Sequence, residues 1–179
     1  MTTEEVDLRI DYFHDAPDDY LRTLGVDRGL LPSRGRWREL YEAESARPIQ
    51  DRDSYAVVWE YDEEIVGFSS VDQISFGEEA FMHLHILSLT YRQSGLGTRF
   101  VKLTASIYFR TLDLQRLYCR PNAFNVAPNR TLQRAGFRYV CTEHSTPGPI
   151  NFPQPVTRWV LLRPPEEAAE DRQEGGPGA

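Results

Sequence analysis

Two histidines separated by one residue, His83 and His85, have the type and spacing to do acid–base chemistry. They lie in the segment 80–89, whose alternation predicts a strand with both rings on one face beside Phe81 and Leu87. An imidazole with an ordinary pKa of about 6.5 can accept a proton at neutral pH. The pair therefore predicts a general base, and the alternative is two histidines that are hydrogen-bonded within a sheet.

A glycine-containing segment follows this strand and has the features of a phosphate-binding loop. It reads Leu87-Ser-Leu-Thr-Tyr-Arg-Gln-Ser-Gly-Leu-Gly-Thr, and apolar positions at helical spacing follow from Leu96 to Phe109. Gly95 and Gly97 lack a Cβ atom, so the backbone can approach a ligand closely. The N–H groups at a helix N-terminus favour a phosphate, and Arg92 adds charge beside them. The alternative is an ordinary strand–helix turn.

These residues resemble the signature of the GNAT superfamily of N-acetyltransferases, Arg/Gln-x-x-Gly-x-Gly/Ala, which Arg92, Gly95 and Gly97 match. The segment Asn125-Val-Ala-Pro-Asn-Arg-Thr-Leu-Gln-Arg-Ala-Gly-Phe is similar to the family's Asn-led helix that ends in Gly-Phe. The two motifs span residues 84–138, and the order of elements extends the likeness to residues 54–163. The resemblance implies an acetyl-CoA-binding fold in which the strand before the loop splays from the next strand and admits the pantetheine arm.

The resemblance also implies roles for individual residues. It implies backbone contacts to the pantetheine from around Leu87 and Leu89, pyrophosphate contacts from residues 93–98, and a contact near the thioester from Asn125. The cofactor-binding residues that we expect are Leu87, Leu89, Arg92, Gln93, Ser94, Gly95, Leu96, Gly97, Thr98, Asn125 and Asn129, and the expected catalytic residues are His83, His85 and Asn125. The His-Leu-His segment is similar to that of the arylalkylamine N-acetyltransferases, in which such a pair removes protons, although here it lies two residues closer to the arginine.

One position departs from the family pattern. Leu132 stands where many members carry a tyrosine that protonates the leaving thiolate. Asn129, Tyr108, Tyr118 or water are the substitutes that the sequence leaves open for this acid.

The patterning around these motifs predicts an α/β (α+β) fold, with a mixed, mostly antiparallel sheet of about six to seven strands flanked by about four helices. One domain should span residues 1–163, followed by a disordered acidic tail at 164–179. The expected strands are 6–13, 55–61, 65–71, 80–89, 114–120, 137–142 and 156–162, with a hairpin turn at Asp62-Glu63. The expected helices begin near Asp15, run through Trp37 to a stop at Pro48, and cover 96–109 and 129–134.

Charge is unevenly distributed along the 179 residues, whose net charge is −7. Residues 1–90 carry −12, residues 91–163 carry +9 and residues 164–179 carry −4. The basic segment holds the phosphate motif, and the acidic segment is expected to attract a cationic amine, with Glu39, Glu42 and Glu44 as candidates. The absence of a lysine run or basic helix stripe argues against nucleic acid.

Other features limit the class of protein. No stretch approaches the ~20 apolar residues of a membrane span, and the acidic N-terminus does not resemble a secretory signal, so we expect a cytoplasmic protein. Cys119 and Cys141 are expected to be free thiols, and no ligand cluster predicts a metal.

The sequence therefore predicts an acetyl-CoA-dependent N-acetyltransferase that moves an acetyl group to a primary amine of a small molecule by direct attack on the thioester. The proline-rich loop 146–155 is expected to overhang the acceptor cleft with Asn151 and Phe152. The alternatives are a protein N-terminal or lysine acetyltransferase and a non-catalytic CoA-binding sensor module. A homodimer is left open.

Overall fold

The computed structural model describes residues 2–87 and 95–165 of the chain. The N-terminal part consists of helices, and the central part begins with three strands. The elements are α1 (Thr3–His14), α2 (Asp18–Leu24), α3 (Arg34–Ser45), β1 (Ser54–Tyr61), β2 (Glu64–Ser75), β3 (Glu79–Ile86), α4 (Leu96–Thr111), β4 (Arg116–Cys119), α5 (Val126–Arg134), β5 (Arg138–Ser145) and β6 (Gln154–Leu162), with short 3₁₀ helices at Arg28–Leu30 and Ile49–Asp51.

The strands form one six-stranded sheet in the order β1-β2-β3-β4-β6-β5. All neighbours are antiparallel except β3 and β4, so the predicted mixed, mostly antiparallel sheet is confirmed. The β1–β2 hairpin turns at Asp62 and Glu63, whose φ angles of 53° and 64° are typical of a type I′ turn. The β3–β4 register ends at the pair Met82–Cys119, whereas β3 continues beside β2 to Ile86. The two parallel strands therefore part beyond Met82.

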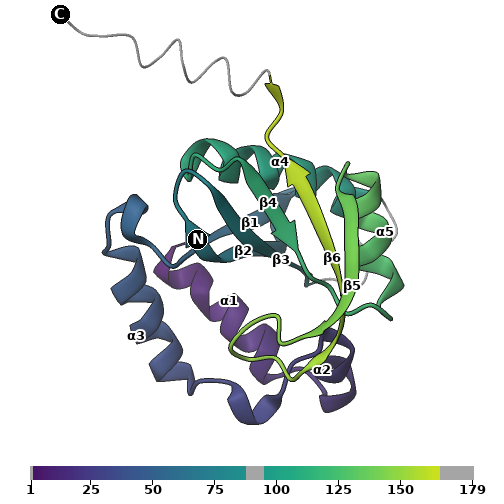
Figure 1. Cartoon of the computed structure of the whole chain (residues 1–179). Coiled ribbons are helices and arrows are strands. Elements are labelled where there is room, and N and C mark those ends of the chain that lie inside the picture. The colour runs from purple at the N-terminus through teal and green to yellow at the C-terminus, as the bar shows by residue number, and fades with distance from the viewer. Residues whose placement is uncertain (1, 88–94, 166–179) are drawn as a thin grey trace, which may run out of the picture.

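Helices cover both faces of the sheet and give the molecule two apolar cores (Figure 1). The larger core lies under α4 and α5 and includes Val101, Tyr108, Leu132 and Met82. The smaller core lies under α1, α2 and α3 and joins Val6, Ile10, Phe13, Leu21 and Trp37 to Phe68 of β2. Because side chains alternate along a strand, β2 and β3 present a different set of residues to each core.

The prediction of a strand at 6–13 is wrong, because this segment is helix α1. Apolar and polar residues alternate along it, but Val6, Ile10 and Phe13 are also spaced as on one helix face and are at most 2% exposed, whereas Leu8 is 37% exposed. Thr2 and Glu5 form a capping box at its start. The structure consequently has five α-helices among its described residues, one more than expected.

The remaining elements match the predictions apart from their ends. Helix α5 begins at Val126 instead of residue 129, and β4 is shorter than the predicted strand 114–120. Helix α3 ends at Ser45, before Pro48, as expected. Residues 166–179, most of the predicted tail, lie outside the described residues.

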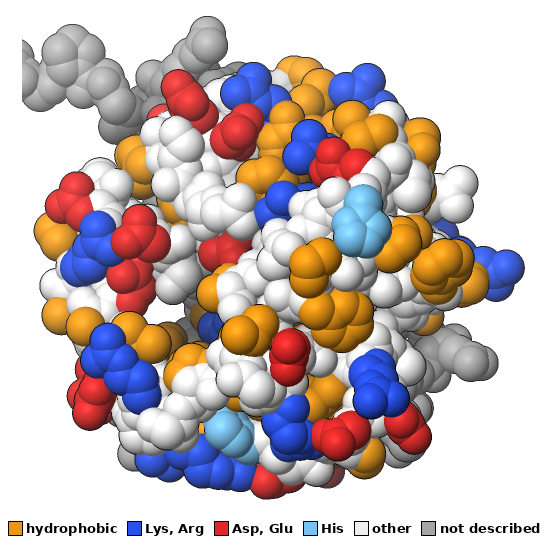
Figure 2. All heavy atoms as spheres, turned by 60° about the horizontal axis from the view of Figure 1, so that its bottom comes forward, with side chains coloured by type: hydrophobic (Ala, Val, Ile, Leu, Met, Phe, Trp, Pro, Cys, Tyr) orange, Lys and Arg blue, Asp and Glu red, His pale blue; other side chains and the backbone are white. Residues whose placement is uncertain are grey.

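Ion pairs engage several carboxylates of the acidic N-terminal segment. Acidic and basic side chains are interspersed over the end of the molecule that α1–α3 form (Figure 2). The arginines that pair with carboxylates here are Arg28, Arg34, Arg36, Arg38 and Arg47. A separate finding is that none of the described helices is long and apolar enough to cross a membrane.

Candidate active site

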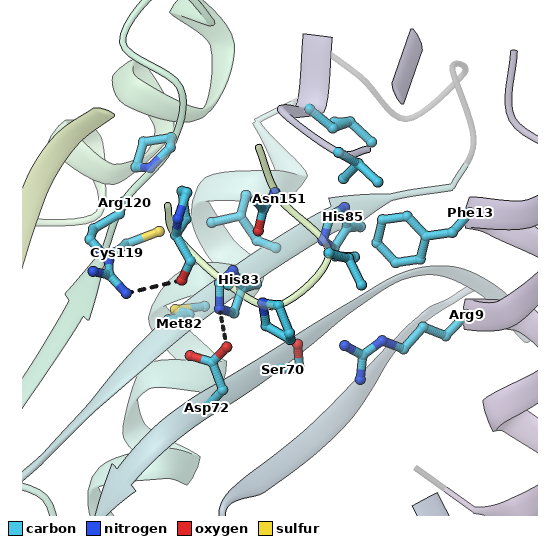
Figure 3. Close-up of a pocket in the computed structure, with 18 of the residues that line it drawn as sticks. Arg9, Phe13, Ser70, Asp72, Met82, His83, His85, Cys119, Arg120 and Asn151 are labelled. Atoms are coloured by element: carbon cyan, nitrogen blue, oxygen red, sulfur yellow. Dashed lines mark hydrogen bonds and ion pairs between the residues drawn. The ribbon is translucent and has the colours of Figure 1, made fainter. Parts of the chain in front are cut away.

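A cavity of about 330 Å³ lies between the smaller core and the edge of the splayed strands (Figure 3). Its floor is the β2–β3 face that carries Ser70, Asp72, His83 and His85, because the register pairs Ser70 with His83 and Phe68 with His85. Its walls come from α1, from α3 and from the 120–128 segment, and loop 147–151 forms its roof. Both predicted histidines therefore face one cavity, as their alternation indicated.

His83 is in contact with a carboxylate on the neighbouring strand. Its Nε2 atom lies 3.1 Å from Asp72 Oδ2, at ion-pair distance, although the atoms are not aligned as a hydrogen bond. Burial acts to raise the pKa of Asp72, but the charges of His83 and Arg120 outweigh it and hold that pKa below its ordinary value. Asp72 is thus a carboxylate at neutral pH, and it faces the Nε2 atom of His83.

His85 lies in a different environment, although it is only two residues away. Its ring stacks on Phe68 at 4.8 Å between centroids, and its Nδ1 lies 3.4 Å from the Tyr12 hydroxyl. Burial, with the charges of His83 and Arg9, lowers the pKa of His85 well below its ordinary value of 6.5. His85 is therefore a neutral ring at neutral pH, which makes it the weaker base of the pair.

Two arginines also line the cavity. Arg9 reaches it from α1, and its guanidinium carbon lies 5.6 Å from the centre of the Trp37 ring. Arg120, just after β4, lies 4.0 Å over the Phe81 ring and donates a hydrogen bond to the carbonyl of Pro147. Burial lowers the pKa of both guanidiniums, and Asp72 opposes that effect. Both remain cations at neutral pH, because a guanidinium in a protein keeps its proton even when burial lowers its pKa.

The roof is attached to the end of α2 by side-chain hydrogen bonds. Asn151 Nδ2 and Gln154 Nε2 both donate to the carbonyl of Gly25, and the amide of Asp27 donates to the carbonyl of Ile150. Asn151 lines the cavity as expected, but Phe152 is absent from the described lining. These bonds keep the roof over His83 and Asp72.

The side of the cavity where the strands part has the features expected for a CoA arm. Gly95 has a φ of 83° at the start of the 16-residue helix α4, and a Cβ atom on Gly97 would lie 3.3 Å from Ile86. Asn125 lines the cavity at the N-cap of α5, where its side chain makes no capping bond. Leu87 donates its N–H to Val66, so its contact with the arm would have to use its carbonyl. The gap between β3 and β4 and the Asn125 side chain, which makes no capping bond, fit a pantetheine chain. The N-terminus of α4 fits a pyrophosphate.

Asn129 does not line the cavity, and its side chain is used in hydrogen bonds within the protein. Its Nδ2 donates to the carbonyls of Asn122 and Asn125, and its Oδ1 accepts from Trp159 Nε1 at 2.8 Å. Asn129 therefore holds the segment that carries Asn125, and its direct contact with the cofactor stays a prediction.

The two tyrosines suggested as substitutes for the missing one do not line the cavity. Leu132 is fully buried in the larger core, and Tyr108 is equally buried with its hydroxyl donating to Ser69. Tyr118 stacks on Phe81. Neither tyrosine is among the described residues that line the cavity.

Cys119 lines the cavity, which its distance from the glycine loop in the sequence did not indicate. The side chain is 3% exposed, and burial raises the pKa of its thiol to about 12. It is a protonated thiol at neutral pH, and the nucleophile in acyl transfer is a thiolate. This state disfavours an acetyl-cysteine intermediate. Both cysteines are free thiols, as predicted.

Several predicted residues lie elsewhere. Leu89, Arg92, Gln93 and Ser94 fall outside the described residues. Glu39, Glu42 and Glu44 do not line the cavity, and Glu44 instead pairs with Arg47 and accepts the amides of residues 53 and 54. Among the described residues, no three His, Cys, Asp or Glu side chains could hold a metal ion.

Sequence reasoning missed three charged residues of the site: Arg9, Asp72 and Arg120. Asp72 had a usable signal, since it lies in the strand that a hairpin pairs with the histidine strand. Arg9 was missed because its segment was predicted to be a strand, whereas it is helix α1. Arg120 comes close only through the parallel pairing of β3 and β4.

The chain belongs to the GNAT family of acetyltransferases, because the model of the acetyltransferase (GNAT) domain matches residues 16–138. It is accordingly an acyltransferase, with acetyl-CoA as its acyl donor. A comparison with curated protein sequences finds no significant match.

Solved structures of acetyltransferases share this fold at low sequence identity. The aminoglycoside acetyltransferase AAC(6′)-Ib in complex with coenzyme A has a TM-score of 0.68 at 14% identity, with 96% of each chain covered. The microcin C7 self-immunity acetyltransferase MccE, with acetyl-CoA and AMP, has a TM-score of 0.70 at 11% identity, covering 90% of this chain and 89% of that one. Spermidine N-acetyltransferase from Vibrio cholerae, with CoA and spermine, has a TM-score of 0.68 at 18% identity, covering 88% and 90%.

Proposed function

We propose that the protein acetylates the primary amine of a small molecule by direct attack of that amine on the thioester of acetyl-CoA. The observation that carries the proposal is the His83–Asp72 contact in a roofed cavity beside the gap between β3 and β4. Two structural neighbours, an aminoglycoside acetyltransferase and a spermidine N-acetyltransferase, support an acceptor that is a small amine. A protonated amine is a cation, and Asp72 is the carboxylate that would attract it.

In this proposal the chain's own residues position the acceptor and move its proton. Acetyl-CoA supplies an activated acetyl group, and the helix α4 N-terminus, Gly97 and Asn125 would hold it. Asp72 contacts His83 Nε2 and orients the ring, and the His83 imidazole accepts the amine proton. His85 stays neutral, and the roof limits the access of water.

The test is CoA release with a panel of primary amines, measured from pH 5.5 to 9 for the wild type, His83→Ala and His85→Ala. Removing a general base typically lowers the rate 10²- to 10⁴-fold, so we expect a loss of roughly that size for His83→Ala and of about tenfold or less for His85→Ala. Equal losses in both variants, or an unchanged pH–rate profile for His83→Ala, would assign the base elsewhere. Tight CoA binding with no turnover of any amine would favour the sensor alternative.

A further inference from the structure

Arg9 occupies a position in the cavity that the proposed chemistry does not use. It projects from α1, and Figure 3 shows its guanidinium directed toward the floor of the cavity near Ser70. The rings of Trp37 and Phe68 lie 5.6 and 6.0 Å from its central carbon, within the range of cation–π contacts. These contacts hold the head group in place while its N–H donors stay available at the edge.

No acceptor among the described residues takes those donors. Arg9 forms no ion pair or hydrogen bond with them, and its Nε atom is buried without a partner. Two other arginines of the α1–α3 segment are paired, Arg28 with Asp18 and Arg38 with Asp7. A cation that is enclosed without a partner is costly, because a charge out of water needs a counter-charge. A bound ligand can supply that counter-charge.

The charge of the cavity limits what this ligand can be. Its described lining contains two guanidiniums, Arg9 and Arg120, but only one carboxylate, Asp72, which His83 already contacts. Set against that one carboxylate, the two guanidiniums leave one excess positive charge among these groups. An amine in its reactive, deprotonated form that also bears one carboxylate carries the matching single negative charge. A planar carboxylate also suits the fork of N–H donors on a guanidinium.

The other side chains that line the cavity indicate that the ligand carries an apolar substituent. Phe13, Val26, Trp37, Leu40 and Ile150 line the cavity between α1, α3 and the roof. A volume of about 330 Å³ lies at the small end of the range for ligand pockets. The space therefore suits a small apolar group in addition to the two polar ends.

We infer that the acceptor is an apolar amino acid whose free carboxylate binds Arg9 while its amine faces His83 and Asp72. This inference rests on the proposed function and specifies its substrate class. In the overall reaction, a C–N bond to the acetyl group replaces its C–S bond. The amine loses one proton, the released thiol carries one, and the product is an N-acetyl amino acid.

The test compares substrates that differ only in the carboxylate. We would measure kcat/KM for L-leucine and L-phenylalanine and for their amides, with the wild type, Arg9→Met, Arg9→Lys and Arg36→Met. Met keeps an apolar stem without charge, and Lys keeps the charge without the planar fork. Arg36 is an exposed arginine of α3 that pairs with Glu39 outside the described lining, and it serves as the matched control. The acid-to-amide ratio within one preparation does not depend on the fraction that is folded.

We expect the wild type and Arg36→Met to prefer the acids at least tenfold. We expect Arg9→Met to lose that preference by a factor of ten to a hundred, and Arg9→Lys to keep part of it. Calorimetric titration of N-acetyl-L-leucine against its amide, with CoA present, should give the same order of binding without turnover.

The outcomes separate this inference from the function on which it rests. If the wild type acetylates the amides as well as the acids, or if Arg9→Met keeps the preference, Arg9 is not a carboxylate site, although the proposed acetyltransferase stands. If simple amines and amino acids alike fail to release CoA, the proposed function is wrong. The titration then decides the subsite alone, and equal binding of acid and amide would reject it.

Discussion

His83 and His85 are two residues apart on one strand and face one cavity, yet their surroundings make them chemically different. His83 contacts a carboxylate that its neighbours keep ionised, whereas His85 is packed against Phe68 and Tyr12. Burial destabilises the protonated form of an imidazole, and it lowers the pKa of His85. The residue types alone did not distinguish the two, because the difference comes from β2 and α1.

The two thiols also differ at this scale, and the difference can be measured. Burial raises the pKa of Cys119 to about 12, from an ordinary value of 9.0, so its thiolate fraction near pH 7.5 should be about a thousandfold smaller than that of an ordinary thiol. We expect iodoacetamide to modify Cys141 in the folded protein and to leave Cys119 unmodified, as read by mass spectrometry. Denatured protein, in which both should react, is the control. Rapid native labelling of Cys119 would contradict its buried, protonated state and reopen the acetyl-cysteine route.

At the scale of elements, the cavity depends on the attachment of the proline-rich loop to the end of α2. Gly25 accepts hydrogen bonds from Asn151 and Gln154 through its carbonyl, and it adopts a φ of 72°. Its missing side chain matters as well, because a Cβ atom there would lie 1.9 Å from the Gln154 side chain. The junction therefore requires glycine for two independent reasons.

We expect Gly25→Ala to lower the free energy of unfolding by about 3 kcal/mol, from backbone strain together with the displacement of Gln154. Gly35→Ala is the matched control, because a Cβ atom on that residue of α3 would meet nothing within 4 Å. Because Gly35 is the second residue of α3, its replacement by alanine should leave stability unchanged or raise it slightly. Urea unfolding of both variants measures the difference. A loss below about 1 kcal/mol for Gly25→Ala would show that the loop tolerates separation from α2.

For the whole molecule, the buried histidine makes stability depend on pH. The pKa of His85 is lowered well below 6.5 in the folded state, whereas in the unfolded chain it returns to its ordinary value. Below about pH 6.5 the unfolded state therefore binds a proton that the folded state does not. The free energy of unfolding should fall with decreasing pH, by up to about 1.4 kcal/mol per pH unit. Asp72 affects stability at lower pH. Its pKa is lowered in the folded state, so the stability that it contributes is lost as the pH falls below 3.8, the ordinary pKa of the group.

Urea unfolding at pH 7.5 and 5.5 tests this dependence. We expect the wild type to lose stability between the two values and His85→Phe to lose about 1 kcal/mol less, because the phenyl ring does not titrate. The exposed His144 of β5 is the control position, and His144→Gln should behave like the wild type. An identical loss in the wild type and His85→Phe would show that other groups cause the acid sensitivity.

The amino-acid sequence determined those features that depend on local patterns. The β1–β2 hairpin, the strand with both histidines on one face, the glycine-led helix α4 and the family follow from residue types at short spacing, because turns, alternation and helix starts are local properties. Local pattern was ambiguous for α1, where alternation and helical spacing coincide, and burial of Val6, Ile10 and Phe13 decided it.

Only the tertiary structure decided which charges share the cavity. Arg9, Asp72 and Arg120 come from α1, β2 and the end of β4, far apart along the chain. The segment charges suggested that the acidic half would attract a cation, but several of its carboxylates are paired with arginines, and an arginine from that half enters the cavity. Electrostatic interactions depend on distance and burial, which follow from sheet register and helix packing. The net charge of a segment therefore does not set the charge of the site that it helps to form.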